Sequence, residues 1–256
     1  MSLSYEERRR TILEQLAERE KVEVQALAER LAVSAETVRR DLERLEKEGL
    51  LKKVYGGAVP PRMELREPPF AQRLGLHEAG KAAIGRYAAS LVREGETIMV
   101  DHGTTMLGLV RHLRDRADVT IVTHSVPVLL LAMERFAGKL FFAGGELNAR
   151  LQSVAGAMTE RTLGRLNVHK AFLSVGGVSL QDGITDFDYG EASISRIMLE
   201  RAEEAIVLAD HSKIGKTAFA KIAELDEVRL IVTDGDCPPQ WPEKFRERGT
   251  ELIAVE

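Results

Sequence analysis

Apolar residues in the first sixty positions recur at the spacing of short amphipathic helices. This spacing predicts one helix over residues 5–18 and a second over about 24–31. Ser34, a favourable N-cap residue, is expected to begin a third helix that runs to about Glu48 and ends at Gly49. Residues 50–59 contain a glycine pair and predict a β-hairpin. Three helices followed by a hairpin predict a winged helix-turn-helix.

The pattern changes after two proline pairs, Pro60–Pro61 and Pro68–Pro69, which predict a linker over residues 61–77 between domains 1–60 and 78–256. After a helix over residues 78–93, short apolar segments alternate with amphipathic ones. The expected strands are Thr97–Asp101, Val119–Thr123, Leu140–Ala143, Ala171–Val175, Ala205–Ala209, Leu230–Thr233 and Glu251–Val255. The helices expected between them include Thr104–Arg114, Val126–Glu134, Glu191–Glu203 and Pro242–Arg248. This alternation predicts an α/β domain with a mainly parallel sheet, whose ligands collect at the carboxyl ends of the strands.

Composition narrows the class of protein. The chain has 256 residues, a formal net charge of −4, a single cysteine and no apolar run of membrane-spanning length. Its N-terminus runs straight into charged residues, so we expect no signal peptide, no membrane association and a cytoplasmic location. Because acids and bases are about balanced in the first sixty residues, any DNA-binding charge must be gathered on one face.

The third helix and the hairpin carry the candidate DNA contacts. In a winged helix-turn-helix the third helix enters the major groove, where arginine is well shaped to contact guanine. Arg8 to Arg10 and the hairpin lysines are placed to neutralise phosphates. The alternative is that these arginines form an ordinary solvated face, or that the fold serves dimerisation. The candidate residues are Ser34, Glu36, Thr37, Arg39, Arg40, Arg44, Lys52 and Lys53.

Polar and glycine-rich turns follow several of the predicted strands in the second domain. Residues 101–105, Asp-His-Gly-Thr-Thr, lie between a strand and a helix, where backbone N–H groups and two hydroxyls favour an anion. The alternative for Thr104 is a simple helix cap. Further turns contain Gly144–Gly145, Gly176–Gly177 and Asp182, while Glu191 begins a helix and Lys213 supplies a cation.

The residues of the third helix and hairpin resemble the DeoR family of bacterial transcription regulators. The matching string runs from Val33 through Thr-Val-Arg-Arg-Asp-Leu at 37–42 to Gly-Gly-Ala at 56–58. The resemblance implies that Thr37, Arg39 and Arg40 contact DNA, that Asp41 braces the arginines, and that Leu42 and Leu45 are core. The chain departs from the family at Lys52–Lys53, where arginine is commoner, and at Tyr55, where histidine is common.

The second domain resembles the sensor domain of the same family, whose fold is related to ribose-5-phosphate isomerase. The resemblance implies that Gly103, Thr104 and Thr105 hold the phosphate of a small phosphorylated metabolite. It places around the sugar part Asp101, Ser125, Gly144, Gly145, Asp182, Glu191 and Lys213. It further implies a repressor of carbohydrate-metabolism genes that binds a double-stranded DNA operator as a homodimer or homotetramer, without a cofactor.

Two histidines depart from the family motifs. His102 stands where serine is usual, and His124 stands where asparagine is usual. Protonated imidazoles would help to bind phosphate. A metal site with His211 is a second hypothesis, although the spacing matches no metal motif. The third hypothesis is that these histidines contact no ligand and only hold neighbouring residues in place. We therefore assign no metal but include both histidines among the candidate effector contacts.

Two other functions compete with a ligand-responsive regulator. The first is a sugar-phosphate isomerase with an added DNA-binding domain, for which Asp182, Asp186, Glu191 and Lys213 would supply the base and the cation. The second is a structural DNA-binding protein without a ligand. Kinship of fold does not transfer activity, so the regulator is the favoured prediction. Residues 60–69 are the expected element that couples ligand to DNA.

Overall fold

The chain forms two compact units, Met1–Met63 and Glu64–Glu256. The computed structural model describes residues 4–18, 21–48, 50–59 and 67–256. The predicted helix end at Gly49 and the pair Pro60–Pro61 lie outside the described residues. Each unit buries an apolar core of its own.

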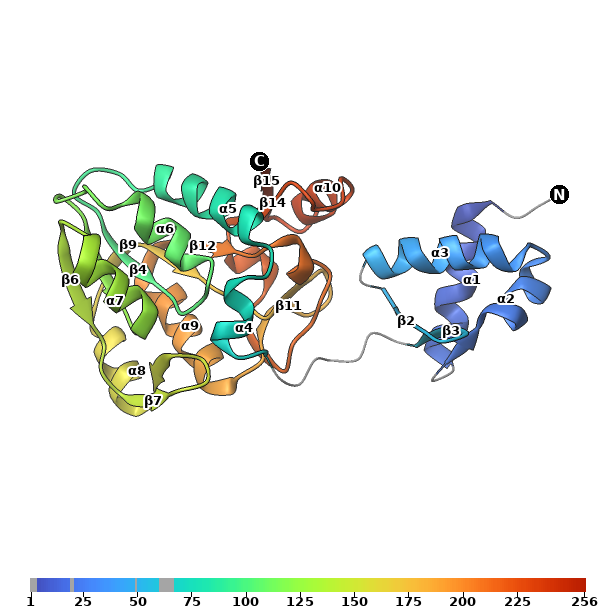
Figure 1. The fold of residues 1–256 in the computed structure, drawn as a ribbon, viewed down its shortest axis with the longest axis horizontal. Coiled ribbons are helices and arrows are strands. Elements are labelled where there is room, and N and C mark those ends of the chain that lie inside the picture. The colour runs from blue at the N-terminus through green and yellow to red at the C-terminus, as the bar shows by residue number, and fades with distance from the viewer. Residues whose placement is uncertain (1–3, 19–20, 49, 60–66) are drawn as a thin grey trace. The chain divides into compact units, whose positions relative to one another are not determined.

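The N-terminal unit is a helix-turn-helix with a small three-stranded sheet, as predicted (Figure 1). Ser34 begins the third helix, because its Oγ accepts the backbone N–H of Thr37 at 3.1 Å. The helices close over a core that includes Ile12, Leu27 and Leu42. In chain order the elements are α1 (Tyr5–Glu18), β1 (Val22–Glu23), α2 (Val24–Leu31), α3 (Ala35–Lys47), β2 (Lys52–Val54) and β3 (Gly57–Val59).

The Gly-Gly-Ala sequence of the hairpin has a separate structural role at each position. Gly56 adopts a φ of +78°, which favours glycine. Gly57 lies opposite Glu23 of β1, and a Cβ there would lie 1.9 Å from the carbonyl oxygen of Val22. Ala58 is fully buried. The motif therefore lets β1 pair closely with β3, a strand pairing that the sequence analysis did not predict.

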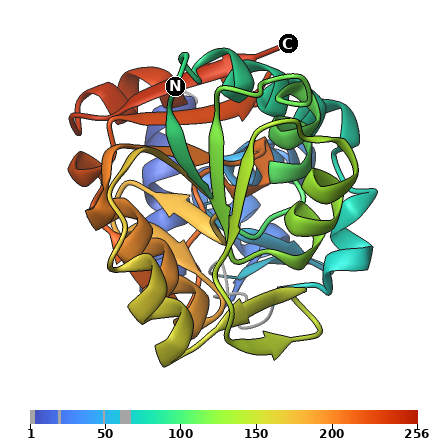
Figure 2. The ribbon, with the colours of Figure 1, turned by 90° about the vertical axis from the view of Figure 1, so that its left-hand side faces the viewer.

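The C-terminal unit is built on one seven-stranded sheet in which every pair of neighbours is parallel (Figures 1 and 2). Its order is β15-β14-β12-β9-β4-β5-β6. The strands are β4 (Thr97–Val100), β5 (Thr120–Thr123), β6 (Lys139–Phe142), β9 (Val168–Leu173), β12 (Ala202–Leu208), β14 (Leu230–Asp234) and β15 (Glu251–Val255). All seven correspond to predicted strands, so the prediction of a parallel α/β sheet is confirmed.

Helices cover both faces of this sheet, as Figure 2 shows. Alternate residues of a strand serve opposite faces. Ile98 and Val100 of β4 pack in the core with α5, α6 and α7, whereas Met99 packs in the core with α8, α9 and α10. The helices are α4 (Phe70–Leu74), α5 (Glu78–Ser90), α6 (Met106–His112), α7 (Val126–Arg135), α8 (Ala157–Leu163), α9 (Tyr189–Arg201) and α10 (Trp241–Arg246), with short 3-10 helices η1 (His211–Lys213) and η2 (Leu225–Glu227).

Several short elements were not predicted. A helix, α4, lies inside the range expected to be linker, and its Phe70 is buried in the core beneath α5 and α6. A hairpin and a second antiparallel sheet add five strands of three or four residues: β7 (Glu146–Asn148), β8 (Ser153–Ala155), β10 (Gly177–Ser179), β11 (Gly183–Asp186) and β13 (Ala220–Ala223). Such short strands carry too few residues to show a period of two.

Candidate DNA-binding face and ligand site

The candidate DNA contacts of the N-terminal unit lie on the solvent-facing side of α3. Glu36, Arg39, Arg40 and Arg44 are exposed, and Thr37 is half-buried. Among the described residues, Arg39 and Arg40 pair only with Glu36 of the same helix, with N–O distances of 3.3 and 3.8 Å. Exposed pairs of this kind contribute little to stability. Both guanidinium groups can therefore exchange this partner for a phosphate or a base edge.

Arg44 and the two wing lysines differ in how firmly they are held. The guanidinium of Arg44 lies over the Tyr5 ring, 4.1 Å from its centroid. Lys53 connects β2 to α3, because its Nζ lies 3.0 Å from a carboxylate oxygen of Glu43. Lys52 is exposed on the same strand. Ser34 is used as the cap of α3, so its hydroxyl shapes the start of that helix.

The prediction that Asp41 braces the arginines of α3 is wrong. Its carboxylate instead accepts two hydrogen bonds from Arg8 of α1, at 2.6 and 3.1 Å. Asp41 is on the buried face of α3, so its side chain points toward α1 and away from Arg39 and Arg40. Arg8 is thereby engaged within the unit, and its expected role at DNA phosphates stays a prediction. Arg10 remains largely exposed.

A cavity of the C-terminal unit lies at the carboxyl ends of β4, β9 and β12. Thr104 and Thr105 follow β4, Ser174 follows β9, and Lys213 belongs to η1 after β12. Parallel strands place these segments at one edge of the sheet. Gly103 fits here because a Cβ would lie 2.3 Å from Ser174 Oγ. The remaining wall comes from residues that the sequence analysis did not single out: Glu67, Pro68, Arg73, Leu76, His77, Lys81 and Lys216 among them.

Arg73 is the cation of this cavity with the most unused hydrogen-bonding capacity. Its Nη1 donates to Glu67 at 2.7 Å, but its buried Nε and Nη2 have no partner. Lys81 donates to the Arg73 carbonyl at 2.7 Å. Burial lowers the pKa of Lys81, an effect that Asp210 opposes. A buried donor without an acceptor costs free energy, so the cavity wall is suited to an anion.

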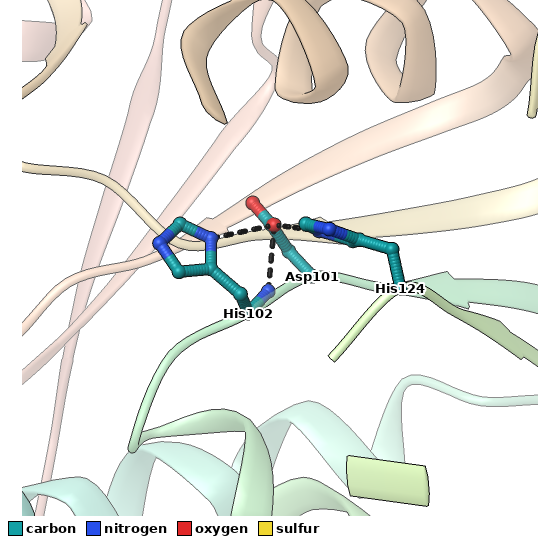
Figure 3. Close-up of side chains that lie close together, drawn as sticks. All are labelled: Asp101, His102 and His124. Carbon is teal, nitrogen blue, oxygen red and sulfur yellow. Dashed lines mark hydrogen bonds and ion pairs between the residues drawn. The ribbon is translucent and has the colours of Figure 1, made fainter. Parts of the chain in front are cut away.

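Beside the cavity, four side chains form a wholly buried group that we call the acid–histidine cluster: Asp101, His102, His124 and Glu191. Figure 3 shows both imidazole rings directed at one oxygen of Asp101. His124 Nε2 lies 2.8 Å and His102 Nδ1 3.1 Å from this Oδ1. The other oxygen, Oδ2, accepts the Ser174 backbone N–H at 2.9 Å and the Ser195 hydroxyl at 3.0 Å.

Charge in the cluster shifts several pKa values. Burial raises the pKa of Asp101, but hydrogen bonds from His102 and His124 outweigh it and hold that pKa well below its usual range. Burial lowers the pKa of His102, but the carboxylates of Glu191, Asp101 and Asp186 raise it to about 10. Burial raises the pKa of nearby Asp186 to about 7, although His102 opposes this. The cluster thus contains anions that require positive partners.

The remaining effector candidates lie apart from the cavity. Ser125 is buried and caps α7, with Oγ accepting the Val128 N–H at 3.4 Å. Gly144 and Gly145 are exposed beside α8, where the Gly144 carbonyl accepts the Thr159 hydroxyl. Asp182 is exposed in the turn between β10 and β11 and accepts the Thr217 hydroxyl at 2.6 Å. Of the twelve candidates, Thr104, Thr105 and Lys213 line the cavity itself.

Sequence reasoning missed the cations that α4 and α5 contribute to the cavity. Arg73 and Lys81 follow the second proline pair, in a range interpreted as linker and helix surface. A signal was available, since an arginine at 73 among Phe70, Leu74 and Leu76 is typical of an amphipathic turn. Periodicity does not tell, however, which edge of the sheet this turn covers.

Family models match nearly the whole chain. A DeoR-like helix-turn-helix domain matches residues 8–62, and a DeoR C-terminal sensor domain matches residues 76–235. The chain belongs to the DeoR family. This confirms the resemblance on which the sequence analysis relied, and with it the assignment as a DNA-binding transcription regulator.

Individual DeoR relatives align over almost their full length. The HTH-type transcriptional repressor GlcR of Bacillus subtilis (strain 168) is 31% identical over 251 residues, which cover 98% of this chain and 96% of the relative. A putative aga operon transcriptional repressor of Escherichia coli O157:H7 is also 31% identical, covering 97% and 93%. Both relatives are named as transcriptional repressors.

Solved structures similar to this DeoR chain align less extensively. Ribose 5-phosphate isomerase A from Methanocaldococcus jannaschii gives a TM-score of 0.41 at 22% identity and covers 54% of each chain. The sorbitol operon regulator SorC from Klebsiella pneumoniae gives 0.42 at 15% identity, covering 84% of this chain and 92% of SorC. Family membership therefore rests on the sequence matches.

Among the described residues, no helix is long and apolar enough to cross a membrane.

Proposed function

We propose that this DeoR chain represses genes of carbohydrate metabolism and that a phosphorylated sugar-type effector, bound in the cavity, controls its affinity for operator DNA. The observation that supports this most directly is the cavity wall. There the two buried, unpartnered nitrogens of Arg73, Nε and Nη2, accompany Lys81 and Lys213, beside the hydroxyl-bearing Thr104 and Thr105. A phosphate offers several strong acceptors to such donors.

Glu67 lines the cavity and lies in the predicted linker, so a bound effector could act on that segment through this side chain. Its Oε1 binds Arg73 and lies 3.9 Å from Lys213 Nζ, while its buried Oε2 has no hydrogen-bond partner. An entering phosphate would compete with this carboxylate for the same cations. Displacement of Glu67 would then change how residues 67–73, within the predicted linker, are anchored, and a ligand acts allosterically only through such differential contacts.

We further propose that the cavity binds its ligand without converting it. An isomerase needs a carboxylate free to take a proton from bound sugar. The carboxylates considered for that role are Asp182, which is exposed, and Asp186 and Glu191, which are buried; none of the three lines the cavity. The acids that do line it are each bound through one carboxylate oxygen, Glu67 to Arg73 and Asp210 to Ser212.

The test is thermal unfolding of the full chain, followed through Trp241, the single tryptophan, which is buried in the C-terminal unit. Phosphorylated sugars should raise the melting temperature and their unphosphorylated counterparts should not, since ligand at about 100 times its Kd adds about 2.7 kcal/mol. Thr104→Ala and Lys213→Ala should abolish the shift, whereas Lys221→Ala, an exposed lysine on β13, should retain it. An unchanged shift in Lys213→Ala would contradict the assignment of the cavity.

Control of DNA binding is tested separately. Duplexes selected from a random pool by the full chain provide the operator, and fluorescence anisotropy measures its affinity with and without the effector found above. The proposal expects weaker DNA binding with effector, and a smaller effect in Lys213→Ala. Stabilisation by effector without any change in DNA affinity would contradict the regulatory part alone. Turnover of a sugar phosphate would contradict the binding-only part.

A further inference from the structure

The acid–histidine cluster contains two buried carboxylates, Asp101 and Glu191, that need positive charge close to them. His124 Nδ1 lies 3.0 Å from the Val154 carbonyl oxygen, which can only accept, so Nδ1 carries a hydrogen. Its other nitrogen, Nε2, faces the Asp101 carboxylate at 2.8 Å. That nitrogen must therefore present either a second proton or a cation to the carboxylate.

His102 faces the same carboxylate oxygen from the other side. Its Nδ1 lies 3.1 Å from Asp101 Oδ1 and 3.4 Å from Glu191 Oε2. Glu191 is buried, and Oε2 has no hydrogen-bond partner. Two imidazole nitrogens and one carboxylate oxygen of Asp101 thus converge where no solvent reaches, and the Glu191 carboxylate lies close by. One divalent cation would balance both carboxylates, whereas isolated buried charges are costly.

We propose that Asp101 Oδ1, His102 Nδ1 and His124 Nε2 bind one Zn²⁺-class transition-metal ion, with the buried carboxylate of Glu191 as a nearby countercharge. Imidazole with carboxylate suits Zn²⁺ and disfavours Mg²⁺ and Ca²⁺. Bond lengths of about 2.0–2.2 Å in a tetrahedron separate the ligand atoms by about 3.3 Å. The ligand atoms of Asp101, His102 and His124 all lie within 4.8 Å of one another. Asp101 Oδ1 lies 2.8 Å from His124 Nε2 and 3.1 Å from His102 Nδ1, and these two separations require shifts of only a few tenths of an ångström.

Supporting hydrogen bonds hold two of the proposed ligands in place, as is usual around protein metal sites. The Val154 carbonyl orients His124, and the Ser153 hydroxyl donates to Glu191 Oε1. Ser174 and Ser195 hold the second oxygen of Asp101. The three ligand side chains are wholly buried, so the site is shut off from solvent. A metal ion would tie the loop after β4 to the loop after β5, next to Thr104 in the cavity wall.

The test measures metal content of the full chain, produced with a tag that lacks histidine and refolded from denaturant with Zn²⁺, because a buried site loads during folding. We expect about one Zn²⁺ per chain after dialysis, and Co²⁺ loading should give the intense visible absorption of four-coordinate cobalt. His102→Ser with His124→Asn should reduce both to background. The matched control is His211→Asn, which breaks the other described His–Asp grouping, His211 with Asp234 and Asp236, and should leave both unchanged.

Either of two results would overturn the proposal. Wild-type chain that holds less than about 0.1 metal per chain after refolding would show that the cluster binds protons only. Equal metal content in the double variant, or its loss in His211→Asn alone, would place the metal elsewhere. The Co²⁺ spectrum of the wild type keeps the test decisive even if the double variant folds poorly. No sugar or DNA is present, so the outcome is independent of the effector proposal.

Discussion

On the recognition helix α3 the charged side chains are exposed, whereas at the carboxyl edge of the sheet they are buried. Arg39 and Arg40 share one exposed acid, Glu36, at 3.3 and 3.8 Å. Asp101 accepts hydrogen bonds from several surrounding groups and is fully buried. Exposed charges cost little to hold and can exchange partners, while buried ones require every partner at once. The first arrangement suits reversible contact with DNA, and the second fixes the shape of a site.

Among the substitutions that test this contrast between exposed and buried charges, we expect the largest loss of stability at Asp101. Asp101→Ala removes the anion that faces two imidazoles, and breaking a buried charged pair costs about 3–5 kcal/mol. Denaturant unfolding followed through Trp241 fluorescence should show this loss in the C-terminal unit. Asp115→Ala, at an exposed acid, is the matched control and should change stability by less than about 0.5 kcal/mol. A loss below 1 kcal/mol in Asp101→Ala would mean that these buried charges are dispensable.

Cys237 provides an independent probe of the C-terminal unit. Burial raises the pKa of its thiol to about 11, with Asp234 adding to the effect. Because the thiolate is the reactive form, alkylation near pH 8 should be about 100-fold slower in the folded chain than in the unfolded chain. The labelling rate should rise at the denaturant concentration where Trp241 fluorescence reports unfolding of the C-terminal unit. Unfolding of the N-terminal unit should not change it. Fast labelling of the native chain would contradict the buried environment.

A smaller effect is expected for the exposed arginines. Arg39→Ala should weaken operator binding by about 1–3 kcal/mol, as loss of a base contact does, and leave the melting temperature unchanged. Anisotropy on the selected duplex and on mutated duplexes measures both affinity and specificity. Arg135→Ala, at an exposed arginine on α7 of the C-terminal unit, is the control and should leave DNA affinity unchanged. If Arg39→Ala lowers stability but not DNA affinity, the helix face serves packing instead.

The smallest expected effect concerns Lys52 on the wing. If Lys52 neutralises a phosphate, Lys52→Ala should weaken binding to all duplexes alike and reduce the slope of log K against log salt by about 1. Affinity measured at several salt concentrations gives this slope. Lys47→Ala, in the last turn of α3, serves as the control lysine. An unchanged slope would remove Lys52 from the DNA interface.

Much of this architecture was predictable from the sequence because it depends on local pattern. Ser34 is an N-cap with its hydroxyl on the Thr37 N–H, and each of the seven predicted strands lies in the parallel sheet. Periodicity and capping report local geometry, which tertiary contacts preserved here. The family motifs added the recognition helix and the Gly-Thr-Thr turn that lines the cavity.

Partners distant in sequence could not be predicted. Asp41 was expected to brace its neighbours on α3 but binds Arg8, 33 residues away. Arg73 lies on the short helix α4 and Lys81 on α5, and the position of both helices over the sheet edge depends on packing. Asp182, grouped with the effector contacts by motif, lies instead in an exposed turn. In each case the deciding quantity is which face a side chain points to once the elements have packed.

By itself the sequence determined the two units, the parallel order of strand and helix, and membership of the DeoR family, because these depend on periodicity, turn residues and motif strings. Only the tertiary structure decided that His102 and His124 both face one carboxylate, since those residues leave different strands and meet because β4 and β5 are neighbours. It also decided that Arg73 completes a cavity begun by Thr104. Convergence of buried charges depends on strand order and packing, which no local pattern encodes.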